Sequence, residues 1–129
     1  MSKTKNGSRP SILLVEDEAI VALTLKRALE LANYTVPQVV SRGAEVAGAV
    51  SRFSPDVIVM DIRLADDVTG LEAARRVRSF CTSPIIFVTG YPGEEVRGAV
   101  RELPATELLT KPVPPATVVE TIRVLRSDS

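Results

Sequence analysis

The sequence predicts an α/β fold, a doubly wound five-stranded parallel sheet with about five helices. The alternation of two sequence patterns favours this fold. Short runs of β-branched and other apolar residues alternate with segments whose apolar residues recur at helical spacing. Strands that alternate with helices pair in parallel through right-handed crossovers. At 129 residues, the chain fits one such domain and is long enough to bury a substantial core.

The first half of the chain supplies three strands and two helices. We expect the first strand at 12–15 and the second at 34–40, where Pro37 lacks an amide hydrogen and favours a position at the sheet edge. The third strand, at 56–60, is continuously apolar, which is typical of a strand covered on both faces. The inner faces of the two helices are predicted from helical spacing. They comprise Val21, Leu25, Ala28, Leu29 and Ala32, and then Val46, Ala49, Val50 and Phe53.

The second half continues the alternation. A loop at 62–69 precedes a third helix, and the fourth strand follows at 84–88. Glycines weaken the pattern of a fourth helix around 96–103, and a short fifth strand is expected at 107–110. The last helix begins near Pro115, a residue suited to a first helical turn. The inner faces of the third and fifth helices would comprise Leu71, Ala74, Val77 and Cys81, and then Val118, Ile122 and Leu125.

Composition excludes several classes of function. Sixteen basic residues balance sixteen acidic ones, so no overall field favours nucleic acid or an anionic membrane. The chain has no histidine, which excludes Ser-His-Asp and Cys-His catalysis, and its single cysteine suits a reducing cytoplasm. No apolar run is long enough to span a bilayer. We expect residues 1–10 to form a disordered tail, 11–127 to form the domain, and no output domain to follow.

Four of the predicted strands end on polar residues. Glu16 and Asp17 follow the first strand, Asp61 the third, Thr89 the fourth and Lys111 the fifth. The carboxyl ends of parallel strands line one crevice, where open α/β proteins place their ligands. We therefore expect three acids, one hydroxyl and one ammonium group to converge at this edge of the sheet.

Such a set of groups suits phosphoryl transfer. Two carboxylates about 5 Å apart repel by about 3 kcal/mol at an effective dielectric constant of about 20, and a divalent cation removes that repulsion. Oxygen ligands favour Mg²⁺. Asp61 then has two possible roles, metal ligand or nucleophile that forms an aspartyl-phosphate. Lys111 offers a point charge for one phosphoryl oxygen, and Thr89 offers a hydroxyl donor for another.

Four segments together resemble the receiver domain of two-component response regulators, a family of phosphorylated signalling proteins. They are Ile12-Leu13-Leu14-Val15-Glu16-Asp17-Glu18, Val57-Ile58-Val59-Met60-Asp61, Phe87-Val88-Thr89-Gly90 and Leu109-Thr110-Lys111-Pro112. The resemblance covers nearly everything after residue 10 and implies a flavodoxin-like strand order 2-1-3-4-5. It also implies a cytoplasmic protein that serves phosphorelay signal transduction and is not otherwise an enzyme.

The resemblance implies a role for each residue at the crevice. Asp61 would be the phosphoacceptor and Asp17 a direct Mg²⁺ ligand, with Glu16 near the metal. The backbone carbonyl of Arg63 would complete the metal ligands. Thr89 would be the switch hydroxyl and Lys111 the phosphoryl-binding lysine, followed by a cis bond to Pro112. The implied partners are a sensor histidine kinase or phosphotransfer protein and a downstream protein target, with the chain a monomer or weak dimer.

A narrower resemblance concerns the segment around Thr89. Phe87-Val88-Thr89-Gly90-Tyr91 is similar to a Phe-Ala-Thr-Gly-Tyr-like signature that marks one receiver subgroup. Receivers commonly carry an aromatic residue three positions before the lysine, where this chain has Leu108. Tyr91 and the glycine-rich segment 90–98 are therefore predicted to carry the switch instead. Neither Arg63 nor Tyr91 orients water well, so we expect slow autodephosphorylation.

Other charged residues have a simpler interpretation. Many receivers have proline four positions after the phosphoacceptor, where this chain has Ala65 followed by Asp66 and Asp67. We favour a solvated loop over extra metal ligands for these two acids. The basic side chains of the third helix are likewise expected on a solvated face, namely Arg75, Arg76 and Arg78.

Three other functions use similar features. A receiver-like interaction module that is never phosphorylated fits the missing aromatic residue and the unusual loop. An aspartate-nucleophile phosphatase or dehalogenase generally needs a second aspartate two residues after the nucleophile, where this chain has Arg63. A flavodoxin-like cofactor binder would need a phosphate loop after the first strand, where Glu16-Asp17-Glu18 would repel phosphate unless a metal intervened.

Overall fold

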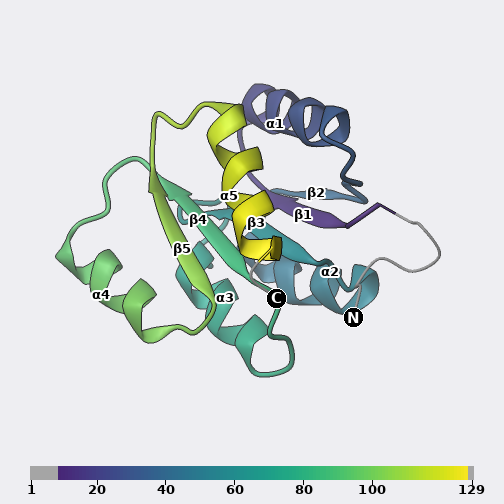
Figure 1. The fold of residues 1–129 in the computed structure, drawn as a ribbon. Helices are drawn as coiled ribbons and strands as arrows, with labels where there is room; N and C mark the ends of the chain where they lie inside the picture. Colours follow the sequence, from purple (N-terminus) through teal and green to yellow (C-terminus); the bar gives the residue numbers. More distant parts are fainter. Residues whose placement is uncertain (1–8, 128–129) are drawn as a thin grey trace.

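A twisted parallel sheet forms the centre of the molecule in the computed structural model, which describes residues 9–127 (Figure 1). The strand order is β2-β1-β3-β4-β5, which confirms the predicted order. The strands are β1 (Ile12–Val15), β2 (Val39–Val40), β3 (Val57–Asp61), β4 (Ile85–Thr89) and β5 (Thr106–Thr110).

Within residues 9–127, four α-helices and one short 3-10 turn connect the strands, and a fifth α-helix follows β5. They are α1 (Ala19–Leu31), η2 (Gly43–Glu45), α2 (Val46–Phe53), α3 (Gly70–Arg78), α4 (Glu94–Glu102) and α5 (Pro115–Ser127). The fourth helix, predicted from a weak pattern, is present, and Glu94 and Glu95 lie in its first turn, where acidic side chains are favourable. Thr69 caps α3 by accepting a hydrogen bond from the amide of Glu72 at 3.2 Å.

The helices cover both faces of the sheet. Helices α1 and α5 lie together on one face, and α2, α3 and α4 lie on the other (Figure 1). Strand residues alternate between the two cores, so that Ile12 and Leu14 pack with α1 and α5, whereas Leu13 and Val15 pack with the opposite helices. All four residues of β1 and all five of β3 are buried, as predicted for strands covered on both faces.

The second strand is shorter than predicted. β2 pairs with β1 only at Val39 and Val40, and Thr35 forms an isolated bridge with Ser11. Pro37 lies between these two contacts and has no amide hydrogen to donate to a ladder. The predicted position at the sheet edge is confirmed.

The predicted inner face of the first helix was partly wrong. Ala22, Leu25 and Leu29 are the buried residues of α1, whereas Val21 is 39% exposed. The buried face is centred between Leu25 and Leu29, and Val21 lies at its margin. The prediction for the third helix needs a smaller correction, because α3 ends at Arg78 and Cys81 packs against the core from the loop beyond it.

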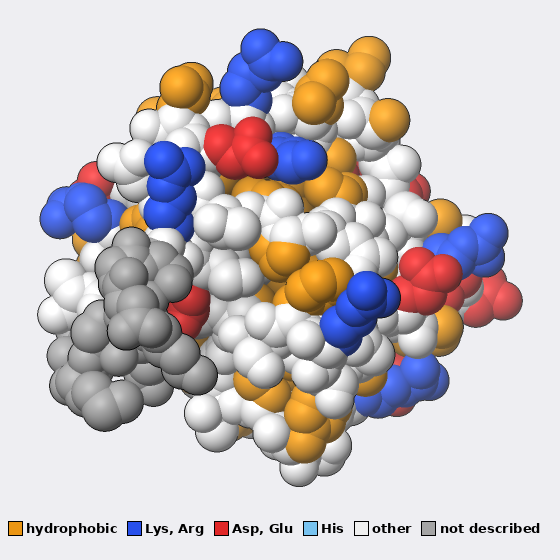
Figure 2. Space-filling view, turned by 90° about the vertical axis from the view of Figure 1, so that its right-hand side faces the viewer, with side chains coloured by type: hydrophobic (Ala, Val, Ile, Leu, Met, Phe, Trp, Pro, Cys, Tyr) orange, Lys and Arg blue, Asp and Glu red, His pale blue; other side chains and the backbone are white. Residues whose placement is uncertain are grey.

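The surface carries no dominant charge on the face shown in Figure 2. Positive and negative side chains are interspersed there, with separate apolar patches between them. No helix within residues 9–127 is both long and apolar enough to cross a membrane. The predicted tail at 1–10 lies almost entirely outside the described residues. Of its last residues, Pro10 accepts a hydrogen bond from the amide of Thr35 at 2.8 Å.

Candidate functional site

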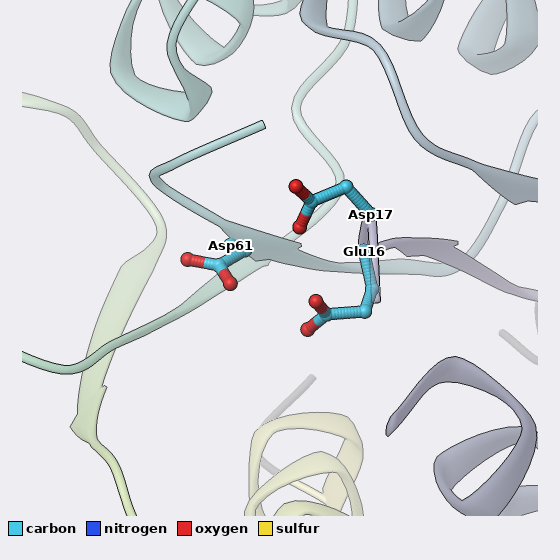
Figure 3. Close-up of side chains that lie close together, drawn as sticks. All are labelled: Glu16, Asp17 and Asp61. Carbon is cyan, nitrogen blue, oxygen red and sulfur yellow. The ribbon is translucent and has the colours of Figure 1, made fainter. Parts of the chain in front are cut away.

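Three acidic side chains converge at the carboxyl end of the sheet. Glu16 and Asp17 follow β1, and Asp61 is the last residue of β3. Each offers a carboxylate oxygen, and the three oxygens lie within 4.8 Å of one another (Figure 3). Glu16 and Asp61 are each only 7% exposed, whereas Asp17 is exposed. The predicted convergence of these acids is therefore confirmed.

Lys111 supplies the countercharge. Its Nζ donates a hydrogen bond to Asp61 Oδ2 at 2.7 Å and lies 3.8 Å from Glu16 Oε1. Burial alone would lower the pKa of Lys111, but the hydrogen bond and the negative charge of Asp61, together with Glu16, raise it above its ordinary value. Lys111 therefore stays protonated beside the acids at neutral pH.

Glu16 is the acid most affected by its surroundings. Burial raises the pKa of Glu16, and the hydrogen bond that its Oε2 accepts from the amide of Glu18 at 3.0 Å opposes this rise, as does Lys111. The carboxylates of Asp61 and Asp17 add to the rise by repulsion. A cation bound by the cluster would remove that repulsion.

The donor set fits a hard divalent cation. Three carboxylates facing one ammonium group leave an excess of negative charge, and all of the offered atoms are oxygens. Oxygen ligands of this kind suit Mg²⁺ or Ca²⁺, and Mg²⁺ commonly keeps several waters and binds through one or two carboxylates. Asp17 faces solvent and leaves one side of the cluster open for such waters or for a substrate oxygen.

The other predicted residues lie around this cluster. The backbone amide of Arg63 donates to Asp61 Oδ1 at 3.2 Å, and its side chain is exposed. Thr89 is 8% exposed at the end of β4, and its carbonyl accepts a hydrogen bond from the amide of Lys111 at 2.7 Å. Register places Val88 beside Asp61 and Thr110 beside Thr89. The predicted cis bond between Lys111 and Pro112 is present.

An apolar pocket of about 650 Å³ opens beside the acids. It lies between α1 and the start of α5, and Glu16, Asp61 and Lys111 form its polar side. Its apolar side includes Ile20, Val21, Leu25, Val113, Pro115 and Val118. Ile20 is 81% exposed, so the apolar lining continues onto the surface of α1.

Tyr91 and Leu108 occupy the positions where the chain departs from the common receiver pattern. Tyr91 lines the pocket and is 96% exposed, so its side chain is not packed in the core. Leu108 is half-buried and packs against the core beneath α4. The role predicted for Tyr91 stays a prediction.

Two charged side chains that we expected to be solvated have hydrogen-bond partners on the backbone far away in sequence. Asp66 accepts hydrogen bonds from the amides of Gly43 and Ala44, at 2.7 and 3.0 Å. Arg78 donates to the carbonyls of Pro104, Cys81 and Ala105 at 2.9 to 3.0 Å. These partners lie up to 27 residues away in sequence, so no local pattern could have revealed them. Arg75 and Arg76, by contrast, are about half exposed and pair with Glu72 on the surface of α3.

The comparisons with known proteins agree with this geometry. The family model described as the response regulator receiver domain matches residues 12–123. The chain belongs to the response regulator receiver family. The resemblance of four sequence segments to receiver domains is thereby confirmed at the level of the family. The narrower signature around Thr89 stays a prediction.

Curated relatives are longer proteins. The phyllosphere-induced regulator PhyR of Methylorubrum extorquens is 35% identical over 108 residues, which cover 83% of this chain and 40% of PhyR. The aerobic respiration control protein ArcA of Escherichia coli is 33% identical over 118 residues, which cover 92% of this chain and 49% of ArcA. The chain thus spans less than half the length of these two relatives.

Solved structures show the same fold. The receiver domain of a modulated diguanylate cyclase from Desulfovibrio desulfuricans matches with a TM-score of 0.84 and 31% identity, over 93% of this chain and 95% of that one. The receiver domain of PhyR from Erythrobacter litoralis matches with a TM-score of 0.81 and 26% identity, over 93% and 92%.

Proposed function

We propose that this receiver accepts a phosphoryl group on Asp61 from the phosphohistidine of a sensor histidine kinase or phosphotransfer protein, in a reaction that requires Mg²⁺. The observation that carries the proposal is the meeting of Asp61 with Glu16, Asp17 and Lys111 at one strand edge. A structural core has no use for three adjacent carboxylates, because each pair repels and two of the three are buried.

The residues divide the chemistry among them. A carboxylate oxygen of Asp61 attacks the phosphorus, the bond from phosphorus to the donor nitrogen breaks, and an acyl phosphate forms. The ammonium group of Lys111 pairs with Asp61 Oδ2 before the reaction. When negative charge moves to the transferred group, the flexible lysine can pair with a phosphoryl oxygen instead. Bound Mg²⁺ would neutralise phosphoryl oxygens during transfer. Asp17, Asp61 and the carbonyl of Arg63 would hold it, with Glu16 beside them.

Positioning contributes as much as charge. Both oxygens of Asp61 are already engaged, Oδ1 by the amide of Arg63 and Oδ2 by Lys111. The carboxylate is therefore held in one orientation before a donor arrives, which lowers the entropic cost of the reaction. The domain, at 11–127, acts as a signalling phosphoacceptor in the cytoplasm and is not an enzyme that acts on another substrate.

The surface near Asp61 suits contact with a protein partner. Exposed apolar side chains of α1, Ile20 and Val21, line the pocket beside the acids. Apolar side chains exposed at this edge suit contact with the protein that donates the phosphoryl group. The hydroxyl of Thr89 would bind the transferred group and change the face formed by α4, β5 and α5, which a downstream protein reads.

Beryllofluoride tests the proposal, because it mimics an acyl phosphate. We expect ¹⁵N–¹H spectra of the Mg²⁺-loaded protein to change around Asp61, Thr89 and Lys111 when beryllofluoride is added. Asp61→Asn keeps the volume of the side chain and removes the charge, so it serves as the control and should show no change. An unchanged wild-type spectrum would reject phosphorylation and favour the interaction module that is never phosphorylated, which Leu108 in place of an aromatic residue and the unusual loop after Asp61 also fit.

A further inference from the structure

The loop that follows Asp61 is fastened to a distant part of the chain. This β3–α3 loop covers residues 62–69, and it lies against the connection between β2 and α2. The amide of Ala65 donates to the carbonyl of Ser41 at 3.0 Å. The carboxylate of Asp66 accepts from the amides of Gly43 at 2.7 Å and of Ala44 at 3.0 Å. Each oxygen of Asp66 thus has its own backbone partner.

The two segments are also in close steric contact. Gly43 is buried, and a Cβ atom added to it would lie 2.0 Å from the carbonyl oxygen of Val68. The side chain of Val68 packs against the core beneath α2 and α3. Only glycine fits at position 43 while the loop keeps this path. The loop is therefore held at 65, 66 and 68, by hydrogen bonds and by contact.

The other end of the loop adjoins the reactive carboxylate. The amide of Arg63 donates to Asp61 Oδ1 at 3.2 Å, and the amide of Gly70 donates to the carbonyl of Ile62 at 2.8 Å. A Cβ atom on Gly70 would lie 2.2 Å from the carbonyl oxygen of Asp61. The hydrogen bond between Ile62 and Gly70 joins the two ends of the loop. A displacement of residues 65–68 would therefore also shift the backbone of Arg63.

We propose that Asp66 is a positioning residue, which fixes the β3–α3 loop so that the backbone carbonyl of Arg63 stays in place for the metal beside Asp61. The inference rests on the proposed Mg²⁺ site and adds a residue to it. The carboxylate acts at the first turn of a helical segment that runs from η2 into α2, where free amides and the helix dipole favour negative charge. Ala65 stands where many receivers have proline, so this contact supplies stiffness that proline would otherwise give.

Asp66 is not an additional metal ligand. Both of its oxygens accept backbone hydrogen bonds, and the cluster that can hold a cation within residues 9–127 consists of Glu16, Asp17 and Asp61. The hydrogen bonds from Ala44 and Gly43 lower the pKa of Asp66, so the carboxylate is ionised throughout the physiological range. Its neighbour Asp67 is exposed and provides a matched control of the same charge on the same loop.

The test measures Mg²⁺ affinity by NMR titration of the full chain, with Asp66→Ala, Asp66→Asn and Asp67→Ala as variants. We expect Asp66→Ala to weaken Mg²⁺ binding by about tenfold, the lower end of the effect of residues that orient metal ligands. Asp66→Asn keeps one acceptor oxygen and should fall between Asp66→Ala and wild type. Asp67→Ala should stay within about twofold of wild type, because surface charges are strongly screened.

Two further measurements separate positioning from general destabilisation. Urea unfolding shows whether each variant is folded under the titration conditions, and amide exchange of Gly43 and Ala44 reports the contact itself. Faster exchange at these amides together with weaker Mg²⁺ binding supports the positioning role. Equal Mg²⁺ affinities of Asp66→Ala and Asp67→Ala would overturn it. Failure of wild type to bind Mg²⁺ would reject the proposed function, a result that is distinct from a loss seen only in the Asp66 variants.

Discussion

Asp17→Asn should make the metal-free protein more stable and at the same time remove its response to Mg²⁺. In the metal-free protein, Asp17 faces Glu16 and Asp61 across less than 4.8 Å between ligand oxygens. At a separation of about 5 Å, each carboxylate pair repels by about 3 kcal/mol at a dielectric constant of 20 and by about 0.8 kcal/mol in bulk water. Asp17 is exposed, so the lower value applies to its two pairs.

The net gain is smaller than the sum of these two pairs. Solvent and dissolved ions screen the exposed carboxylate of Asp17, so the full repulsion is not present in wild type. We expect Asp17→Asn to raise the free energy of unfolding of the metal-free protein by about 1 kcal/mol. At a Mg²⁺ concentration ten times the Kd, binding should stabilise wild type by about 1.4 kcal/mol. The order of stability would then reverse, with wild type the more stable protein.

Urea unfolding followed by far-ultraviolet circular dichroism measures both quantities at constant ionic strength. Asp67→Asn is the control, since it removes an exposed carboxylate outside the cluster and should change the free energy of unfolding by less than about 0.5 kcal/mol. The reasoning is refuted if Asp17→Asn lowers the stability of the metal-free protein. It is refuted equally if the variant gains as much from Mg²⁺ as wild type does.

Three further outcomes are expected. Lys111→Met should slow labelling of Asp61 by a small acyl phosphate about 10²-fold, because it removes a charge that stabilises the transition state. Equal labelling rates of the variant and wild type would contradict this. Arg63→Ala combined with Tyr91→Ala should speed loss of the phosphoryl group by about tenfold, which is about 1.4 kcal/mol in the barrier, and an unchanged half-life would show that neither side chain obstructs water. Asp66 has a pKa lowered from 3.8, so the stability it contributes is complete above pH 3.8 and is lost as pH falls through its folded-state value. The difference in unfolding free energy between wild type and Asp66→Asn should therefore shrink below pH 3.8, and a difference that is constant from pH 3 to 6 would argue against this origin.

The strands and the acidic cluster were predictable because their signals are local. Each apolar run defines a strand, and parallel order brings the residues that follow β1 and β3 to one edge without further information. Glu16, Asp17, Asp61 and Lys111 therefore meet as the sequence indicates. The end of β2 was less predictable, since Pro37 breaks the ladder inside an otherwise strand-like segment.

The contacts of the loops could not be predicted in the same way. Asp66 binds backbone amides 23 and 22 residues away, and Arg78 binds carbonyls 26 and 27 residues away. These partners depend on the path of each loop, which sequence pattern does not define. A charged side chain in a loop or at a helix end is predicted to be solvated unless its long-range partner is known. The rotation of α1 that leaves Val21 at the margin depends likewise on packing against α5.

Mass spectrometry after reaction with acetyl phosphate tests the central claim most directly. With Mg²⁺ present, we expect one phosphoryl group per chain, labile to hydroxylamine and mapped after borohydride reduction to Asp61. Removal of Mg²⁺ with a chelator should abolish the label, and so should Asp61→Asn. A label on another residue, or a yield on Asp61 that does not depend on Mg²⁺, would contradict the account.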